Sequence, residues 1–471
     1  MIQIDLSGKS RNEVRLVGIG FVDEPVKNYF TAEPFSCFPR LTGCGLRLYV
    51  GLGDPGTVTG RRVMDAVAKA VKTLREYHIH DALFDLSAAD AKMGARAIPF
   101  AVLGMKLGLY RYEIYRTDER KENFHFFLSS SEHPLPQPLE RTLREAETLA
   151  DGIIKARDLV NAPANRLTPA AMADALLKEA GECGVEAEAL DERQMEALGM
   201  GALLAVGKSS GNPPRLIVLR YRGDGEAPFT ALVGKGVTCD TGGYCLKGRD
   251  SMAGIKGDMA GGAAVAQTVF ALAKNRVKVN VVGVIPACEN RISRQSFLPG
   301  DVLRSMSGKT IEIKNTDAEG RLILADAATY AVRIEKAARV VDLATLTGAV
   351  VGALGFTTAG VLTDDESLWN RLQKAAGLSE EQFWRLPIYP EYEELLKSKI
   401  ADIKNMGESY CGTITAGLFV RAFCEGRPWL HIDIAGTAWV DKPFFEHQSC
   451  GATGSPVATL YELLHSAPRP C

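Results

Sequence analysis

The sequence lacks the features that define several classes of protein. No apolar run in the 471 residues reaches the roughly 18 positions that a membrane-spanning helix requires. Residues 1–6 alternate apolar and polar side chains, which predicts a first strand and not the basic head and apolar core of a secretion signal. The formal net charge is only -2, so the overall charge favours neither nucleic acid nor an anionic membrane as a partner.

Two kinds of metal or redox site are also missing from the sequence. The ten cysteines include no Cys-x-x-Cys pair, and free thiols in a cytoplasmic protein are the expected state. No histidine lies between His133 and His431, which excludes a histidine-based zinc site in the middle of the chain. Any metal site in that region must therefore rely on carboxylates.

The chain is long enough for two or three domains, and its 46% hydrophobic content allows cores of normal size. We expect a smaller N-terminal α/β (macro-like) domain over residues 1–137, ending in a polar stretch that contains prolines. A connecting helix is expected over residues 138–162. The larger domain would then span residues 163–471.

Strand-length apolar runs alternate with helical stretches after Pro163. This order predicts a central, mostly parallel sheet covered by helices, and so an α/β fold of two domains. In the larger domain the expected strands are residues 216–221, 229–233, 277–285, 340–344 and 430–434, with helices at residues 259–274 and 322–334. In the smaller domain we expect strands at residues 46–50 and 110–115, and a helix at residues 60–77.

Charged residues concentrate in three otherwise apolar or glycine-rich stretches, residues 234–247, 256–258 and 315–321. Each stretch follows or opens a regular element, and ligands in open α/β sheets bind at the ends of strands. The candidate functional residues in these stretches are Lys235, Asp240, Lys247, Asp258, Asp317, Glu319 and Arg321.

A set of converging carboxylates needs cations to offset its repulsion. If residues 315–321 are extended, alternate residues share one side, which would place Asp317, Glu319 and Arg321 together. With Asp240 and Asp258 the site would hold four carboxylates. Two divalent cations about 3.5–4 Å apart can share such ligands and activate a water, and oxygen ligands suit magnesium, manganese or zinc.

Less specific interpretations exist for each residue taken alone. Asp258 at a helix start is typical of an N-cap, and a lysine beside glycine is typical of a solvated loop. A structural role for the whole set would nevertheless leave Lys235, Asp240 and Lys247 without a purpose in an apolar, glycine-rich stretch. The residues together therefore favour a carboxylate metal site.

Residues 315–321 read Asn-Thr-Asp-Ala-Glu-Gly-Arg, which resembles the signature of the leucyl aminopeptidase (cytosol aminopeptidase) family of hexameric di-metal exopeptidases. The spacing of Lys235, Asp240, Lys247 and Asp258 is also similar, as are residues 158–161, 300–302, 344–348 and 433–436. The resemblance covers the whole larger domain and continues more weakly into the smaller one, as at residues 107–111.

The resemblance implies a metal-dependent aminopeptidase with two ions, zinc or manganese, with magnesium or cobalt possible in the more exchangeable site. One ion would be held by Lys235, Asp240, Asp258 and Glu319, and the exchangeable ion by Asp240, Asp317 and Glu319. Lys235 would have to coordinate as a neutral amine, because an ammonium has no lone pair.

The resemblance also implies how the reaction proceeds and where the peptide binds. A metal-bridging water would attack the scissile carbonyl, Lys247 would stabilise the oxyanion, and Arg321 would hold a bicarbonate that acts as general base. The substrate would also contact Cys245, Asn315 and Leu346, and a pocket for an apolar, leucine-like N-terminal side chain would be formed by Ile255, Thr345, Gly348, Ala435 and Ala438.

Five positions depart from the family pattern, and one alternative function stays open. Methionine is usual at Ile255, phenylalanine is common at Cys239, serine is common at Thr241 and frequent at Cys245, and arginine is common at Ser455; none of these departures removes a ligand. The alternative is an additional DNA-binding or regulatory role of the N-terminal domain. The basic residues there are accompanied by acids, which is typical of a solvated surface, so nucleic acid is not an expected partner; they are Arg116, Arg120 and Lys121, beside Asp118, Glu119 and Glu122.

Overall fold

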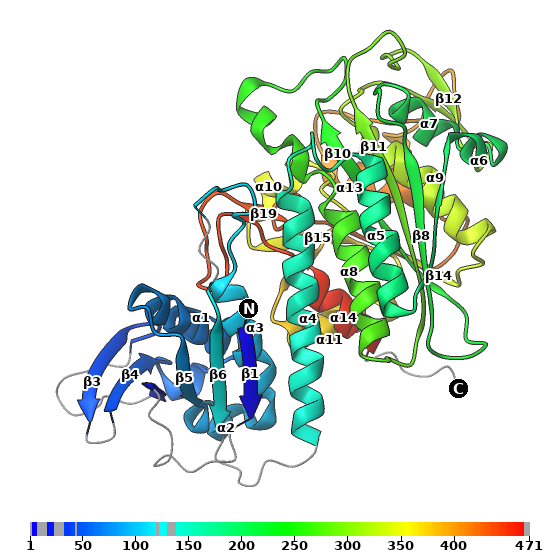
Figure 1. The fold of residues 1–471 in the computed structure, drawn as a ribbon. Helices are drawn as coiled ribbons and strands as arrows, with labels where there is room; N and C mark the ends of the chain where they lie inside the picture. Colours follow the sequence, from blue (N-terminus) through cyan, green and yellow to red (C-terminus); the bar gives the residue numbers. More distant parts are fainter. Residues whose placement is uncertain are drawn as a thin grey trace. The chain divides into compact units, whose positions relative to one another are not determined.

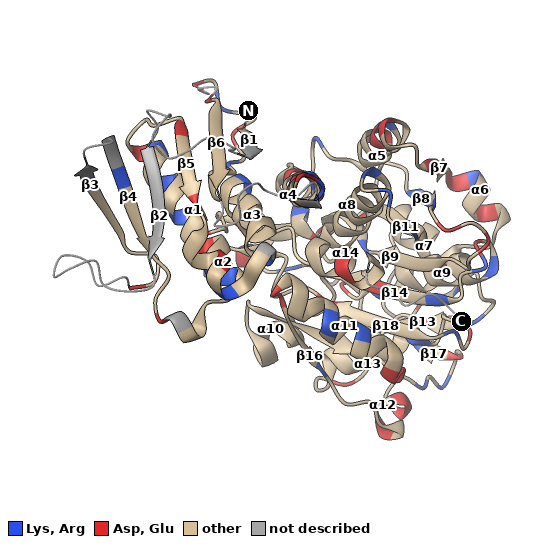
Figure 2. Cartoon of the chain, turned by 90° about the horizontal axis from the view of Figure 1, so that it is seen from below, with Lys and Arg blue, Asp and Glu red and all other residues tan. Residues whose placement is uncertain are grey.

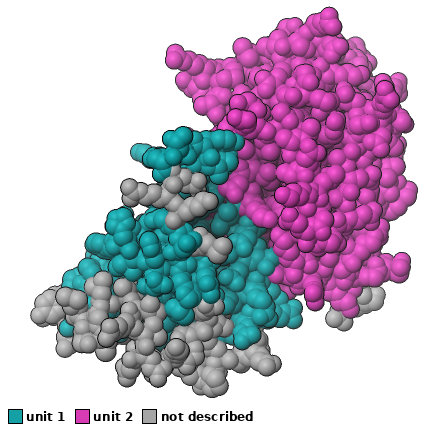
Figure 3. Space-filling model, viewed as in Figure 1, with its two compact units in different colours: residues 1–154, 442–450 teal, residues 155–441, 451–471 magenta. Residues whose placement is uncertain are grey.

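The computed structural model describes residues 2–6, 17–22, 33–42, 45–118, 122–129 and 138–465. It contains two compact units, one of residues 1–154 with 442–450 and the other of residues 155–441 with 451–471 (Figure 3). The helix expected over residues 138–162 is present as α4 (Pro138–Asn161). The domain boundaries drawn from the sequence stay a prediction. In the described part of the chain, no helix combines the length and apolar character needed to cross a membrane.

The first unit is built on a six-stranded sheet. Its order is β1 (Ile2–Leu6), β6 (Phe124–Ser129), β5 (Asp81–Asp85), β2 (Val17–Val22), β4 (Gly45–Gly51) and β3 (Cys37–Thr42), and all neighbours are parallel except β3 and β4. Helices α1 (Gly60–Glu76) and α3 (Ala97–Leu109) pack closely at Gly104, where a Cβ would lie only 2.4 Å from the Met64 carbonyl oxygen. Helix α2 (Ser87–Met93) and the first part of α4 also belong to this unit.

The predicted strand at residues 110–115 is wrong. Helix α3 ends at Leu109, and the amide of Tyr110 donates to the Leu107 carbonyl before the chain enters a turn. The tyrosine-rich run has the side chains of a strand, but it pairs with no strand of the described sheet. Strand propensity is realised only where cross-strand neighbours are present, and this run has no such partner among the described residues.

The second unit contains a nine-stranded sheet. Its order is β16 (Gln382–Arg385), β15 (Thr358–Leu362), β18 (Trp429–Asp433), β14 (Arg339–Ala344), β9 (Thr230–Gly234), β11 (Asn280–Asn290), β8 (Arg215–Arg222) and β7 (Glu186–Leu190), and β10 (Gly236–Asp240) also pairs with β11. The central strands β18, β14, β9 and β11 run parallel, as predicted. Antiparallel pairs lie to either side, at β11–β8, β8–β7 and β15–β18, so the sheet is mixed.

The strand expected at residues 277–285 begins later and ends later than predicted. Its first residues belong to the turn after helix α8, where the amide of Val277 donates to the carbonyl of Leu272. Strand β11 then runs from Asn280 to Asn290 and is buried throughout. This extension brings the polar residues at its carboxyl end into the site described below.

Helices cover both faces of the large sheet (Figure 1). Successive residues of β11 point to opposite faces of the sheet. A Cβ at Gly283 would meet Val265 of α8 (Ala260–Lys274) at 2.9 Å on one face, whereas Val282 and Val284 belong to the core formed with α9 (Glu319–Arg333) on the other. In Figure 2 the strands of this sheet are largely tan, whereas charged residues colour outer helices such as α6 (Glu192–Ala197) and α12 (Pro390–Glu394). The other elements of this unit are α5 (Pro169–Cys183), α7 (Gly201–Gly207), β12 (Val302–Arg304), β13 (Thr310–Glu312), α10 (Gly348–Leu354), α11 (Glu366–Ser379), β17 (Ile403–Lys404), α13 (Gly412–Arg421), β19 (Trp439–Val440), β20 (Gly451–Ala452) and α14 (Val457–His465).

Glycines bring α8 against the sheet, as its run of small residues predicts. A Cβ at Gly261 would lie 2.3 Å from the Leu343 carbonyl oxygen, and one at Gly262 would lie 2.6 Å from the side chain of Ile285. The close approach lets the backbone of α8 contact the chain at the end of β9, where the amide of Gly262 donates to the Lys235 carbonyl.

We predict that Asp326→Ala destabilises the second unit strongly. Asp326 of α9 is fully buried and accepts hydrogen bonds from the amides of Leu203, in the first turn of α7, and Met306, at 2.9 and 2.8 Å. Burial raises the pKa of this carboxyl to about 7. Without it two buried amides lose their acceptor, which costs about 2 kcal/mol or more in the free energy of unfolding. Urea denaturation would measure the loss, and the exposed Asp174→Ala should change it by less than about 0.5 kcal/mol.

Candidate metal centre

Lys235 lies where the chain passes from β9 to β10, two short strands that pair with β11 one after the other. Its amide donates to the Leu343 carbonyl, and its carbonyl accepts from Gly262, so the backbone is held on both sides. The side chain is buried. Its Nζ lies 2.7 Å from Oδ2 of Asp258 and 2.8 Å from Oε1 of Glu319.

Gly320, inside the 315–321 motif, provides the space for this lysine. A Cβ at Gly320 would lie 2.5 Å from Cε and 2.7 Å from Nζ of Lys235. Any side chain at this position would displace the amine from the two carboxylates. The glycine of the motif is therefore a packing requirement of the site.

Asp240 and Lys247 flank a loop that begins at the end of β10. Gly242 and Gly243 adopt φ values of +86° and +62°, a conformation that glycine accepts readily. The loop returns so that Nζ of Lys247 lies 2.8 Å from Oδ2 of Asp240 and also bonds Oδ1 of Asp317. One lysine thus bridges carboxylates from two separate segments.

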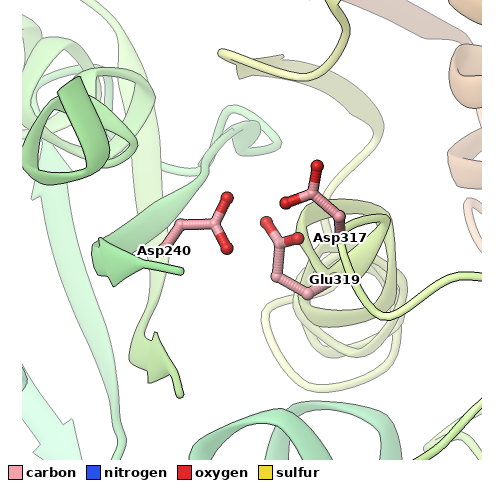
Figure 4. Close-up of side chains that lie close together, drawn as sticks. All are labelled: Asp240, Asp317 and Glu319. Carbon is pink, nitrogen blue, oxygen red and sulfur yellow. The ribbon is translucent and has the colours of Figure 1, made fainter. Parts of the chain in front are cut away.

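The carboxylates of Asp240, Asp317 and Glu319 converge, with one oxygen from each within 4.8 Å of the others (Figure 4). The predicted extended conformation of residues 315–321 is wrong: Asp317 lies in a turn and Glu319 is the first residue of α9. The carboxylates meet because the turn folds Asp317 back over the helix start. Arg321 lies one half-turn further along the helix.

Asp258 joins the cluster and does not cap a helix. It stands between the 3₁₀ segment η4 (Arg249–Gly257) and α8. The N-cap position of α8 is occupied by Met259, which makes no side-chain capping bond. Its Oδ1 accepts a hydrogen bond from Oγ1 of Thr345 at 2.7 Å, while Oδ2 faces Lys235. This geometry excludes the capping interpretation. It also places Thr345, expected to contact substrate, beside the carboxylates.

Burial and mutual repulsion control the charges of the acidic residues. Burial raises the pKa of Asp258 to about 7, and burial together with the Asp240 charge raises the pKa of Glu319 to about 8. The same two causes raise the pKa of Asp317. Each carboxylate is thus easier to protonate than in water, which is the expected response of like charges that lack sufficient cations.

The two lysines respond in the opposite way. Burial alone would lower the pKa of Lys235, but the carboxylates of Asp258, Glu319 and Asp240 outweigh it and raise that pKa. Burial alone would also lower the pKa of Lys247, but the carboxylates of Asp240 and Asp317 outweigh it and raise that pKa. Two ammonium groups therefore offset only part of the charge of four carboxylates.

The donor set fits hard divalent cations. Oε2 of Glu319 is buried and accepts no hydrogen bond from the described residues, and Oε1 of Glu319 and Oδ2 of Asp258 have only their ion pairs with Lys235. Buried oxygens without donors require a cation, and Nζ of Lys235 provides only a single charge among them. Oxygen-rich sites of this kind suit magnesium, manganese or zinc.

Arg321 is buried beside the cluster with unused hydrogen-bond donors. Its Nη1 donates to the Asn405 carbonyl at 2.8 Å, and its Nε has no partner among the described residues. Burial lowers the pKa of the guanidinium to about 10. A buried arginine with spare donors can bind a small anion.

Several expected substrate contacts remain predictions. Nζ of Lys235 lies 3.2 Å from the Thr345 carbonyl, and the amide of Leu346 donates to Asp433, so this loop adjoins the cluster. The side chain of Asn315 accepts from the Asp317 amide and so stabilises the turn. The other expected substrate residues take these places: Cys245 in the loop after β10, Ile255 in η4, Gly348 at the start of α10, and Ala435 and Ala438 after β18.

Asn290 and Asp433 have site contacts that the sequence did not predict. Nδ2 of Asn290, the last residue of β11, donates to Oδ1 of Asp240 at 2.9 Å. A polar residue at the end of a buried parallel strand would have been the signal, but the predicted strand stopped at residue 285. Asp433 stood in a matched motif, yet its bonds to Leu346 and Thr347 depend on the tertiary structure.

Buried carboxylates and lysines at the strand ends of a helix-covered α/β sheet define a metal-dependent hydrolase. The model of the cytosol aminopeptidase family catalytic domain matches residues 154–461, and that of the family's N-terminal domain matches residues 45–119. The chain therefore belongs to the cytosol aminopeptidase family, which confirms the resemblance seen in the sequence. Membership implies metal-dependent hydrolysis at the N-terminus of peptides.

Individual relatives cover nearly the whole chain. A probable cytosol aminopeptidase of Clostridium perfringens (strain 13 / Type A) is 41% identical over 88% of this chain and 85% of its own length. One from Stenotrophomonas maltophilia (strain K279a) is 44% identical over 90% and 85%. The solved structure of a tomato leucine aminopeptidase mutant has a TM-score of 0.88 at 31% identity, over 99% of this chain and 97% of that one. The bottromycin maturation enzyme BotP in complex with Mn also has a TM-score of 0.88, at 34% identity over 96% and 98%.

We predict that Gly320→Ala lowers hydrolysis of a leucyl amide by about 100-fold, because the added methyl group must displace the amine of Lys235. The same variant should retain less metal after purification. Gly377→Ala in α11 is the matched control, since a Cβ there meets nothing within 4 Å. Steady-state kinetics and metal analysis would measure both effects. Normal activity and metal content in Gly320→Ala would contradict the packing argument.

Proposed function

We propose that this aminopeptidase uses two divalent ions to hydrolyse the first peptide bond of peptides with apolar, leucine-like N-terminal residues. The observation that carries the proposal is the convergence of the carboxylates of Asp240, Asp317 and Glu319, among which both oxygens of Glu319 are buried without a hydrogen bond from the described residues. One ion would be held by Lys235, Asp240, Asp258 and Glu319, and the other by Asp240, Asp317 and Glu319. When bound, such an ion pair would activate a water as the nucleophile.

Lys235 would change its protonation state when the ions bind. Its ammonium forms ion pairs with both Asp258 and Glu319. Two dications would replace that charge and would repel the proton at Nζ. The neutral amine then has a lone pair available as a ligand.

Lys247 would act on the substrate as a cation. Its Nζ lies between Asp240 and Asp317, and its side chain is partly exposed, unlike that of Lys235. Negative charge develops on the carbonyl oxygen when water attacks the peptide bond. An ammonium aimed at that oxygen stabilises the tetrahedral intermediate.

Arg321 would hold an anion, bicarbonate, that removes a proton from the attacking water. Its buried guanidinium has donors to spare beside Glu319. The substrate's free α-amine would bind next to Asp317 at the more exchangeable ion, which explains the restriction to N-termini. Leu346 would bind the peptide through its backbone and Cys245 would lie in the substrate-facing loop.

The substrate pocket, the identity of the ions, the oligomeric state and the compartment are proposed from the family. The pocket for the N-terminal side chain would use Ile255, Thr345, Gly348, Ala435 and Ala438. The ions would be zinc or manganese, with magnesium or cobalt possible in the exchangeable site, and the manganese complex of BotP supports manganese. We also propose a homohexamer in the cytoplasm that acts on peptides.

No observation favours the alternative of a DNA-binding N-terminal domain. The exposed Arg116 is paired with Asp118 at 2.7 Å, as expected for a mixed-charge surface. Arg120 and Lys121, named with it, lie outside the described residues.

We predict that Glu319→Gln abolishes hydrolysis of a leucyl amide in the presence of manganese or zinc, while the protein stays folded. The amide lacks the charge that would bridge two ions, so metal binding should also weaken. The matched control is Glu366→Gln, which alters the first residue of the exposed helix α11 and should leave the rate unchanged. Kinetics and circular dichroism would measure the outcome. Full activity of Glu319→Gln, free of wild-type enzyme, would refute the site.

Lys247→Ala should lower turnover on the order of 100-fold or more, as loss of one oxyanion donor does in other hydrolases. Metal affinity should fall much less, because this lysine is not a proposed ligand. The comparison requires kcat at saturating substrate together with a metal titration of each protein. Equal turnover in the variant and the wild type would contradict the assigned role.

A further inference from the structure

Asn290 is the last residue of β11 and is fully buried. The parallel register of β10 and β11 places it directly beside Asp240, the last residue of β10. The sheet itself therefore brings this amide to a proposed bridging ligand. None of the catalytic or metal-binding roles proposed above uses it.

The side-chain amide of Asn290 connects two segments that carry candidate ligands. Its Nδ2 donates to Oδ1 of Asp240 at 2.9 Å and to the carbonyl of Thr316 at 3.0 Å. Thr316 directly precedes Asp317. One NH₂ group thus uses both of its hydrogens to join the β10 loop to the turn before α9.

The acceptors determine the orientation of this amide. A carboxylate oxygen and a backbone carbonyl can only accept, so the NH₂ end of Asn290 must face them. The other end, Oδ1, is buried without a donor among the described residues, and a Cβ at Gly243 would lie 2.9 Å from it. The side chain of Asn290 therefore acts as a hydrogen-bond donor, and the site leaves little space for a longer side chain.

Further bonds hold the same segments together. The Asn290 carbonyl accepts from the amide and the hydroxyl of Thr241, at 3.0 and 2.9 Å. The hydroxyl of Thr316 donates to the Gly242 carbonyl at 2.7 Å and accepts from the Cys245 amide at 2.8 Å. Asn290 stands at the centre of this network.

The network fixes which oxygen of Asp240 faces the other carboxylates. Oδ1 accepts from the Gly242 amide at 3.0 Å and from Asn290. Oδ2 is the oxygen that lies 2.8 Å from Nζ of Lys247. Without the two donors on Oδ1, repulsion by Asp317 and Glu319 would favour rotation of Asp240 away from the cluster.

We propose that Asn290 is a positioning residue of the metal centre, which locks Asp240 and the 315–317 turn in the arrangement that two cations require. The inference rests on the proposed di-metal function. Partners that orient metal ligands in this way typically change metal affinity by roughly 10–100-fold when they are removed.

The test compares Asn290→Ala with Asn280→Ala in the full-length protein. Asn280 is the first residue of the same strand, is 3% exposed, and also joins its side chain to a loop. Its Nδ2 donates to the carbonyls of Gly225 and Ala227, and its Oδ1 accepts from the Asp224 amide. Both substitutions remove a buried amide from β11, but only one is beside the proposed ligands.

Each protein would be stripped of metal and titrated with Mn²⁺ alone by calorimetry, with Tm and the kcat for a leucyl amide measured alongside. We expect both variants to lower Tm, and only Asn290→Ala to weaken Mn²⁺ binding by roughly 10–100-fold. Its kcat should fall at least 10-fold, while that of Asn280→Ala stays within 2-fold of wild type, by the same reasoning. Asn290→Ser, whose short hydroxyl cannot reach both acceptors, is expected to behave like Asn290→Ala and replaces it if that variant does not fold.

An unchanged Mn²⁺ affinity in the Asn290 variants would overturn the inference, as would an equal loss in Asn280→Ala. The proposed function fails separately. If the wild type binds Mn²⁺ but hydrolyses no leucyl amide, the peptidase mechanism is refuted, while a selective loss of affinity in Asn290→Ala still supports the positioning role.

Discussion

Repulsion among four converging carboxylates is the constraint on which the site depends. Asp240, Asp258, Asp317 and Glu319 come from three segments, and their negative charges are favourable at one place only if cations accompany them. Lys235 and Lys247 supply part of that charge, at distances that include 2.7 Å to Asp258 and 2.8 Å to Asp240. The raised pKa values of Asp258 and Glu319 show that two ammonium groups do not fully offset the burial and the repulsion.

The fold provides the rigidity that holds these charges together. The central strands run parallel, so their carboxyl ends meet at one edge, and β10 and β11 end side by side at Asp240 and Asn290. Glycines then allow the close approaches: Gly261 lets α8 contact the sheet, and Gly320 leaves room for Lys235. The buried amide of Asn290 adds donors on the outer side of Asp240. Backbone packing and polar bonds thus oppose an electrostatic force that would separate the ligands.

Errors in the secondary structure predicted from sequence have a common physical origin. Residues 110–115 have strand-forming side chains but pair with no strand of the described sheet. Strand β11 begins three residues later and ends five residues later than its apolar run suggested, because tertiary burial extends to Glu289 and Asn290. Residues 315–321 looked extended, yet Glu319 opens a helix. In each case a local pattern was correct about polarity, while long-range neighbours decided the conformation.

The sequence by itself determined the α/β class, five strands of the large sheet, the family and the charged residues of the site, because residue type, spacing and apolar periodicity are local properties. It could not determine that Asp258 pairs with Thr345 and Lys235 instead of capping a helix, or that Asn290 bonds Asp240. Those contacts join residues 23 to 87 positions apart, through loops whose course depends on packing. Only the tertiary structure brings such groups within hydrogen-bonding distance, since they are far apart in the chain and meet only when it folds.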